Sequence, residues 1–286
     1  MQSRQRITDR ASRRTALAAR PRPAKSKLDE AYVAFAHQLA DLAGDAIRPY
    51  FRRTLRISNK AAAGYDPVTA ADRAAERAMR AAITRRYPDH GIVGEEFATK
   101  DGASPYRWVL DPIDGTRAFI MGSPLWGTLI GLVDGDRPAL GVMDQPFTRE
   151  RFWGAGRGAF LRTPDGEERR LKTRNCPGLA QAVLTTTHPD LFSPVDAEAF
   201  NRVRVRARMV RYGGDCYGYA LLAAGFVDIV VEAGLKPHDV AALIPIIEGA
   251  GGQVTTWEGK PALDGGRILA TGDARVHKEA IALLKG

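Results

Sequence analysis

One nine-residue stretch, Trp108–Thr116, places two carboxylates three positions apart directly after an apolar segment. The apolar residues that precede Asp111 are typical of a short strand. Pro112 fixes its own φ and disfavours a helix at Asp111, and Gly115 supplies backbone freedom or allows close approach. The stretch therefore predicts a tight turn in which Asp111 and Asp114 point into one small space.

Two carboxylates this close repel each other unless a proton or a cation lies between them. A multivalent hard cation with oxygen ligands is the usual solution. A helix that begins at Thr116 would add free backbone N–H groups beside the cation, which suits a phosphate group. The alternative is an ordinary surface turn, because Asp-Pro and Asp-Gly are common turn dipeptides. Taken alone, the stretch leaves both interpretations open.

The rest of the chain can supply a large core. It has 286 residues with 44% hydrophobic content, enough for one large α/β domain or two smaller ones. No apolar run approaches the roughly 20 residues needed to cross a bilayer, and the N-terminus lacks the apolar centre of a secretory signal. Cys176 and Cys216 form no Cys-x-x-Cys pair. We expect a cytoplasmic protein in a reducing compartment, with no membrane contact.

The net charge of +9 is concentrated at the N-terminus. Residues 1–27 contain nine Lys or Arg and one acid, a net charge of +8, which leaves +1 for residues 28–286. This Pro/Ala/Ser/Arg-rich tail is predicted to be disordered. It could bind RNA or an acidic partner, or it could be a transit peptide, a misassigned start or a solvated extension. Because no aromatic residues alternate with the charges, we favour the solvated extension over a nucleic-acid interface.

Two helices are predicted near the start of the body. The first covers about Leu28–Phe51, where apolar residues recur at steps of three and four. The second begins near Thr69, and Thr69 and Asp72 fit an N-cap with its third-position partner, so Asp72 is interpreted as a capping residue. Asp66 precedes this cap and is not explained by it.

The remaining pattern predicts two sheets. A strand at residues 91–94 precedes Glu95 and Glu96, which could be surface charges. An antiparallel meander then follows the opening turn, with strands at residues 128–133, 139–143, 151–153 and 158–162. From about Thr173 strands and helices alternate, with strands at residues 183–187, 209–212, 226–232 and 253–256 and helices at residues 194–206, 216–224, 240–249 and 274–285.

Two further acids lie at predicted element ends in this second half. Glu232 closes the apolar strand at residues 226–232, and Asp239 lies at the entry to the next helix. Asp239 could simply be that helix's N-cap, and Glu232 could be a surface charge.

Three segments together resemble the signatures of the inositol monophosphatase family. They are Gly94-Glu95-Glu96, Asp111-Pro112-Ile113-Asp114-Gly115-Thr116 and Pro237-His238-Asp239-Val240-Ala241-Ala242. The resemblance covers about Leu28 to Gly286. It implies an α+β fold, a layered αβαβα sandwich, with an antiparallel N-terminal sheet beside paired helices and a second, helix-flanked C-terminal sheet. The expected organisation is a basic tail at 1–27, a subdomain at 28–172 that carries the metal-binding motifs, and a subdomain at 173–286 that completes the active site.

The same resemblance implies a site with two or three Mg²⁺ ions and a homodimer. By motif position, the metal ligands are Glu95, Asp111, Asp114, Asp239 and the Ile113 carbonyl. Asp66 and Thr116 hold and deprotonate the attacking water, with Gly115 and Thr116 at the phosphate. Such a site suits phosphomonoester hydrolysis by direct water attack, because the ions stabilise charge on the attacking, transferring and leaving oxygens.

Several residues depart from the general family pattern. Arg117-Ala118-Phe119 follows the Asp-Gly-Thr segment, and His238 replaces the common Trp. These departures resemble the histidinol-phosphatase branch of the family. Histidinol phosphate carries an ammonium group and an imidazole, so an acidic pocket would favour it over a polyol. Asp215 and Glu232 are the candidate acids, although Asp215 could instead cap the helix at Cys216. Arg117 is a further expected substrate contact.

We therefore expect a phosphatase that hydrolyses the small phosphate monoester L-histidinol phosphate in histidine biosynthesis. The alternatives within the family are an inositol-1-monophosphatase and a 3′(2′),5′-bisphosphate nucleotidase. An alternative of another class is a nucleic-acid or transcription partner that uses the basic tail.

Overall fold

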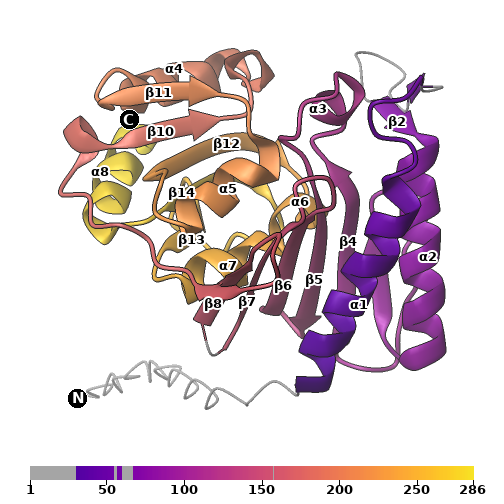
Figure 1. Cartoon of the computed structure of the whole chain (residues 1–286). Helices are drawn as coiled ribbons and strands as arrows, with labels where there is room; N and C mark the ends of the chain where they lie inside the picture. Colours follow the sequence, from indigo (N-terminus) through magenta and orange to yellow (C-terminus); the bar gives the residue numbers. More distant parts are fainter. Residues whose placement is uncertain (1–29, 55–56, 60–66, 157) are drawn as a thin grey trace, which may run out of the picture.

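The computed structural model describes residues 30–54, 57–59, 67–156 and 158–286. The predicted tail at 1–27 and Asp66 lie outside the described residues. Within them, five layers of helices and sheets alternate (Figure 1). The expected αβαβα sandwich is confirmed.

The outer layer on one side is a pair of helices, α1 (Glu30–Ile47) and α2 (Ala70–Arg86). A short hairpin of β1 (Ile57–Asn59) and β2 (Pro67–Thr69) precedes α2. The Thr69 hydroxyl accepts the Ala71 N–H, and the Asp72 carboxylate accepts the Thr69 N–H, which confirms the predicted cap. The first helix ends at Ile47, short of the predicted Phe51, because residues 48–52 form turns.

The pair covers a seven-stranded sheet whose order follows the sequence. The first pairing, β3 with β4, is parallel and the others are antiparallel. Its strands are β3 (Gly91–Gly94), β4 (Tyr106–Asp114), β5 (Gly127–Asp134), β6 (Arg137–Gln145), β7 (Glu150–Ala155), β8 (Gly158–Arg162) and β9 (Glu168–Arg170).

The third layer separates this sheet from a second one. It contains α5 (Asp215–Ala223), α6 (Pro237–Val240) and α7 (Leu243–Gly249). The second sheet has the order β11-β10-β12-β14-β13. Its strands are β10 (Val183–Thr186), β11 (Met209–Tyr212), β12 (Ile229–Leu235), β13 (Gln253–Thr256) and β14 (Gly266–Thr271).

The fifth layer consists of α4 (Pro194–Arg204) and α8 (Ala274–Lys285). The remaining helices are the short α3 (Thr116–Ile120) and the 3-10 turns η1 (Leu179–Gln181) and η2 (Pro189–Leu191). In the described part of the chain, no helix is both long and apolar enough to span a membrane.

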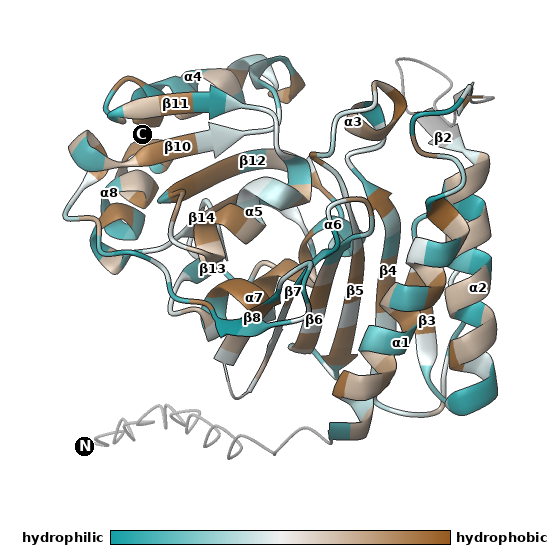
Figure 2. Cartoon of the chain, viewed as in Figure 1, coloured by the Kyte–Doolittle hydropathy of each residue, from teal (hydrophilic) through white to brown (hydrophobic). Residues whose placement is uncertain are grey.

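Alternating side chains connect the layers. Ile130 belongs to the core under α1 and α2, whereas its neighbour Leu129 belongs to the core between the sheets. In β12, Ile229 and Val231 face a third core with α4 and α8, and Val230 faces the middle layer. Because successive side chains in a strand point to opposite faces, both sheets are apolar on both sides, and the central strands are hydrophobic in Figure 2.

Two sequence expectations in the second half are wrong. The helix predicted at 240–249 is interrupted after Val240, because Pro245 lacks the N–H that would bond to the Ala241 carbonyl. The strand predicted at 226–232 runs instead from Ile229 to Leu235. Glu232 is therefore inside the strand, next to a shift of register between Glu232 and Leu235.

Three glycines bring α6 and α7 onto the first sheet. Gly131, Gly141 and Gly154 are direct cross-strand neighbours on β5, β6 and β7. A Cβ added to Gly141 would lie 1.8 Å from the Ala242 carbonyl oxygen, and one on Gly154 would lie 2.3 Å from the Pro245 carbonyl oxygen. The backbone that follows α6 thus rests directly on the sheet backbone.

Replacing Gly141 with alanine should destabilise the fold by about 1–3 kcal/mol or more, because the contacted atom belongs to the backbone and cannot rotate away. Gly156→Ala is the matched control, since an added Cβ there meets nothing within 4 Å, and it should change stability by less than about 0.5 kcal/mol. Urea unfolding measures both variants. Equal midpoints for the two would show that the glycine row does not determine this packing.

Candidate active site

A β-bulge at the end of β4 brings the two aspartates of the opening motif together. Asp111 pairs with Leu129 and Asp114 pairs with Gly127, so three steps along β4 match two along β5. In a regular strand, residues three apart point to opposite faces, and one extra residue reverses that relation. The predicted tight turn after Leu110 is thus a bulged continuation of β4.

Asp239 on α6 completes a compact group with these two. One carboxylate oxygen from each of Asp111, Asp114 and Asp239 lies within 4.8 Å of the others. Backbone donors orient all three side chains. Asp111 accepts the Ile113 N–H at 3.1 Å, Asp114 accepts the Cys216 N–H at 2.6 Å, and Asp239 accepts the Lys236 N–H at 2.6 Å.

Asp239 is the third residue of α6 and not its N-cap, which is Lys236. Its carboxylate binds the cap backbone and also lies in the acidic group, so the helix-end interpretation and the site interpretation are compatible.

A second group shares Asp111. Oxygens of Glu95 and Asp111 and a ring nitrogen of His238 also lie within 4.8 Å of one another. The Glu95 N–H donates to the Leu110 carbonyl at 3.2 Å, which anchors the segment after β3 beside Asp111. The side chain of Glu96 is only 1% exposed, so the surface-charge interpretation is wrong for it. The His238 ring therefore joins the candidate ligands, a role that its replacement of Trp in the sequence did not indicate.

Burial and mutual repulsion raise the pKa values of these acids. The pKa of Asp111 is well above its usual range through burial first and then through Glu95, Asp114 and Asp239. The pKa of Asp114 is raised by burial and by Asp215 and Asp239. In the described ranges, no Lys or Arg side chain forms an ion pair with Asp111, Asp114 or Asp239. Such a set of oxygens is suited to a hard divalent cation.

Asp72 supplies a further test of that fit. Its Oδ2 accepts the Thr69 N–H and hydroxyl at 2.8 and 2.6 Å, but its Oδ1 is buried without a hydrogen-bond partner. Burial and the charge of Glu95 raise its pKa. An unpaired buried carboxylate oxygen is costly, and a cation between Asp72 and Glu95 would satisfy it. Capping uses only one of the two Asp72 oxygens, and the second is available to a cation, which the capping pattern in the sequence did not indicate.

The expected phosphate segment adjoins the acidic group. Gly115 has a φ of 87° and is the N-cap of α3, which begins at Thr116. A Cβ on Gly115 would lie 3.0 Å from the Leu125 carbonyl oxygen and 3.2 Å from Asp215, so a side chain would be strained and crowded there. The Thr116 hydroxyl donates to the Ile113 carbonyl at 3.0 Å.

Two further acids belong to this region, the half-buried Asp215 beside Gly115 and the buried Glu232, whose charge interacts with that of Asp215. Asp215 is the first residue of α5, with a φ of 45°, and the N-cap is Gly214, so the prediction that Asp215 caps this helix is wrong. Burial raises its pKa to about 6, although the charge of Arg117 acts in the opposite direction. Glu232 is 4% exposed and accepts the Thr187 N–H and hydroxyl at 2.7 and 3.0 Å. Its pKa rises to about 7 through burial and the charge of Asp215, and its interpretation as a surface charge is also wrong.

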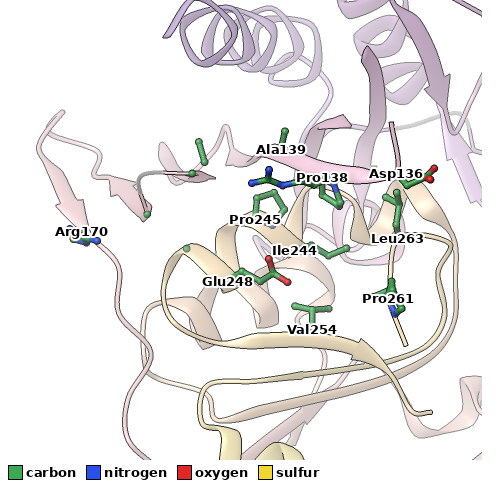
Figure 3. A pocket seen from close by; sticks show the side chains of 16 residues that line it. Asp136, Pro138, Ala139, Arg170, Ile244, Pro245, Glu248, Val254, Pro261 and Leu263 are labelled. Atoms are coloured by element: carbon green, nitrogen blue, oxygen red, sulfur yellow. The ribbon is translucent and has the colours of Figure 1, made fainter. Parts of the chain in front are cut away.

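A hollow of about 740 Å³ lies elsewhere, where α7 and the segment before β14 meet the turns after β5 and β7 (Figure 3). Its charged lining residues include Asp136, Arg137, Arg170 and Glu248. None of the site residues expected from the sequence lines it, so the acidic group and this hollow are separate features.

Comparison with known proteins supports the relationship suggested by the motifs. Residues 28–285 match the model of the inositol monophosphatase family. The chain is 46% identical to the Arabidopsis thaliana protein named bifunctional phosphatase IMPL2, chloroplastic, over 89% of this chain and 75% of that protein. It is 35% identical to histidinol-phosphatases of Chlorobaculum parvum and Mycobacterium tuberculosis, over 86% of this chain and 94% and 95% of theirs.

Comparison with solved structures indicates the same family relationship. An inositol monophosphatase from Zymomonas mobilis superimposes with a TM-score of 0.81 at 43% identity, covering 91% of this chain and all of that one. The extragenic suppressor protein suhB from Bartonella henselae superimposes with a TM-score of 0.79 at 29% identity, covering 89% and 98%. This chain belongs to the inositol monophosphatase family and is accordingly a phosphomonoester hydrolase of a metal-dependent kind.

Proposed function

We propose that this protein hydrolyses L-histidinol phosphate to L-histidinol and phosphate, a step of histidine biosynthesis. The observation that carries the proposal is a pair of acids, the half-buried Asp215 and the buried Glu232, beside the acidic metal-binding group. Histidinol phosphate presents an ammonium group and an imidazole, which compensate buried negative charge better than a neutral polyol does. The relatives named histidinol-phosphatase support the same substrate.

We assign two or three magnesium ions to Glu95, Asp111, Asp114 and Asp239, with the Ile113 carbonyl as a further ligand. Magnesium bound there supplies positive charge that activates water and offsets the charge that develops on the phosphoryl oxygens. The Thr116 hydroxyl and the backbone of Gly115 and Thr116 bind the phosphate.

The attacking water is oriented by Thr116 and Asp66. Asp215 and Glu232 hold the cationic end of the leaving group, with Arg117 beside Asp215. In this proposal water attacks the phosphorus directly, without a covalent nucleophile from the protein. Cys216, whose N–H orients Asp114, is unsuited to that role because it is buried and its thiol pKa is raised.

A second candidate substrate is inositol 1-phosphate, because the similar Zymomonas mobilis structure is titled an inositol monophosphatase. A carboxylate such as Glu232 can also accept hydrogen bonds from sugar hydroxyls. The substrate therefore depends on whether the acids recognise charge or hydroxyl groups.

Asp114→Asn should remove magnesium binding and lower turnover at least about a hundredfold, because bound metal contributes several kcal/mol to the transition state. In the unfolded chain Asp114 ionises at about pH 4, whereas in the folded protein its pKa is raised. The free energy of unfolding of the metal-free protein therefore falls as pH rises above about 4. The variant treated with chelator should therefore melt higher than chelator-treated wild type at pH 8 and gain nothing from Mg²⁺. Asp264→Asn, an exposed acid, is the control and should retain the Mg²⁺-induced rise.

Substrate preference is tested with Mg²⁺ and a panel of histidinol phosphate, inositol 1-phosphate and adenosine 3′,5′-bisphosphate. The expected result is the highest kcat/KM on histidinol phosphate, by about tenfold or more, since a hydrogen bond to a charged group contributes about 1.5–3 kcal/mol. Phosphate release provides the measurement. A preference for either of the other two substrates would reject the histidinol assignment.

Glu232→Gln tests charge recognition. In wild type, the KM for histidinol phosphate relative to that for a neutral sugar phosphate should fall as pH rises through about 7, where Glu232 becomes ionised. The variant should lose this dependence and show a relative KM about tenfold higher at pH 8. Glu198→Gln, on the exposed face of α4, should behave as wild type. Equal effects of Glu232→Gln on both substrates would mean that this acid does not recognise charge.

A further inference from the structure

Glu76 on α2 is a fully buried carboxylate outside the set of acids assigned above. Its Oε1 accepts the Arg80 Nε–H at 2.6 Å, one helical turn later. The same carboxylate reaches the segment after β3, where it accepts the Glu96 N–H at 2.7 Å and the Phe97 N–H at 3.3 Å. Arg80 completes the contact by donating to the Phe97 carbonyl at 2.9 Å.

These bonds hold the segment that carries Glu95 from one side. From the other side, the Glu95 N–H donates to the Leu110 carbonyl on β4 at 3.2 Å. A Cβ on Gly94 would lie 1.9 Å from the Glu76 carboxylate, so that carboxylate occupies the space beside the residue preceding Glu95. The backbone on both sides of Glu95 is thus fixed, and with it the direction in which Glu95 extends toward Asp111 and His238.

Close packing alone would not require a carboxylate at position 76. Burying a carboxylate costs several kcal/mol before its partners compensate, and an apolar side chain would fill the same space without that cost. The partners here are two N–H groups of one segment, and that segment begins with a candidate metal ligand. Arg80 offsets the charge of Glu76, so α2 holds the segment without an uncompensated negative charge beside Glu95.

We propose that Glu76 is a positioning residue that orients Glu95 for a divalent cation. The proposal rests on the metal site assigned under the proposed function and is independent of which phosphate ester is hydrolysed. Groups that orient a metal ligand typically change metal affinity or activity by about 10–100-fold when they are removed.

The test measures Mn²⁺ binding to the full chain by electron paramagnetic resonance titration, without substrate. Glu76→Ala should raise the Kd for Mn²⁺ by about 10–100-fold. Glu76→Gln keeps one acceptor oxygen but directs an NH₂ group at backbone donors, so its Kd should lie between those of wild type and Glu76→Ala. Excess Mg²⁺ should restore most of the turnover lost by either variant.

Asp228→Asn is the matched control. Asp228 is also buried and accepts the Val183 N–H at 2.7 Å and N–H groups from Nε and Nη2 of Arg174, and it belongs to the second sheet region rather than to the segment after β3. This variant should lower the melting temperature but leave the Kd for Mn²⁺ within about twofold of wild type, because it removes a buried ion pair without touching a ligand segment.

A folded Glu76→Ala with the Mn²⁺ affinity of Asp228→Asn would overturn the proposal. If Glu76→Ala does not fold, wild-type affinity in Glu76→Gln overturns it equally. Wild-type protein that binds no Mn²⁺ would instead overturn the metal assignment itself. Tight Mn²⁺ binding with no turnover of histidinol phosphate would reject only the substrate.

Discussion

The extra residue in β4 between Asp111 and Asp114 is the constraint on which the site depends. Without it, the strand's alternation would direct one aspartate toward the core under α1 and α2. With it, both point to the face where α6 and α5 deliver Asp239 and the Cys216 N–H. The bulge brings two carboxylates that repel each other close together. Buried apolar neighbours such as Leu110 and Ile113 stabilise the backbone there.

The acids come from segments that are distant in the sequence and lie on different layers. Asp111 and Asp114 belong to the first sheet, Asp239 lies on α6 directly after β12 of the second sheet, and the segment with Glu95 is held by β4 and α2. A cation bound among them would therefore connect the layers as a cross-link does. Cohesion between the two sheets would then depend on the free cation concentration, since a ligand that binds only the folded state stabilises it by mass action.

The layered architecture and most elements could be predicted from the sequence because apolar periodicity and turn residues are local signals. The motifs named acids that lie close together in the structure. The bulge could not be predicted, since it depends on pairing with β5. Likewise β14, the break before α7 and the interior position of Glu232 depend on neighbouring strands and helices. Asp72 and Glu76 resemble ordinary helix residues until the β3 segment is placed beside them.

The glycine row of β5, β6 and β7 has a different consequence. Most contacts between layers join side chains, and a change on one side of such a contact can be compensated by a change of size on the other. Gly141 and Gly154 contact the main chain of α7 and of the residues before it. Main-chain atoms are the same for every residue type, so no substitution in α7 can make room for a larger side chain on the strands. Side chains along α7 can therefore be exchanged without disturbing this contact, whereas any side chain at Gly141 or Gly154 would have to displace the main chain that lies on it.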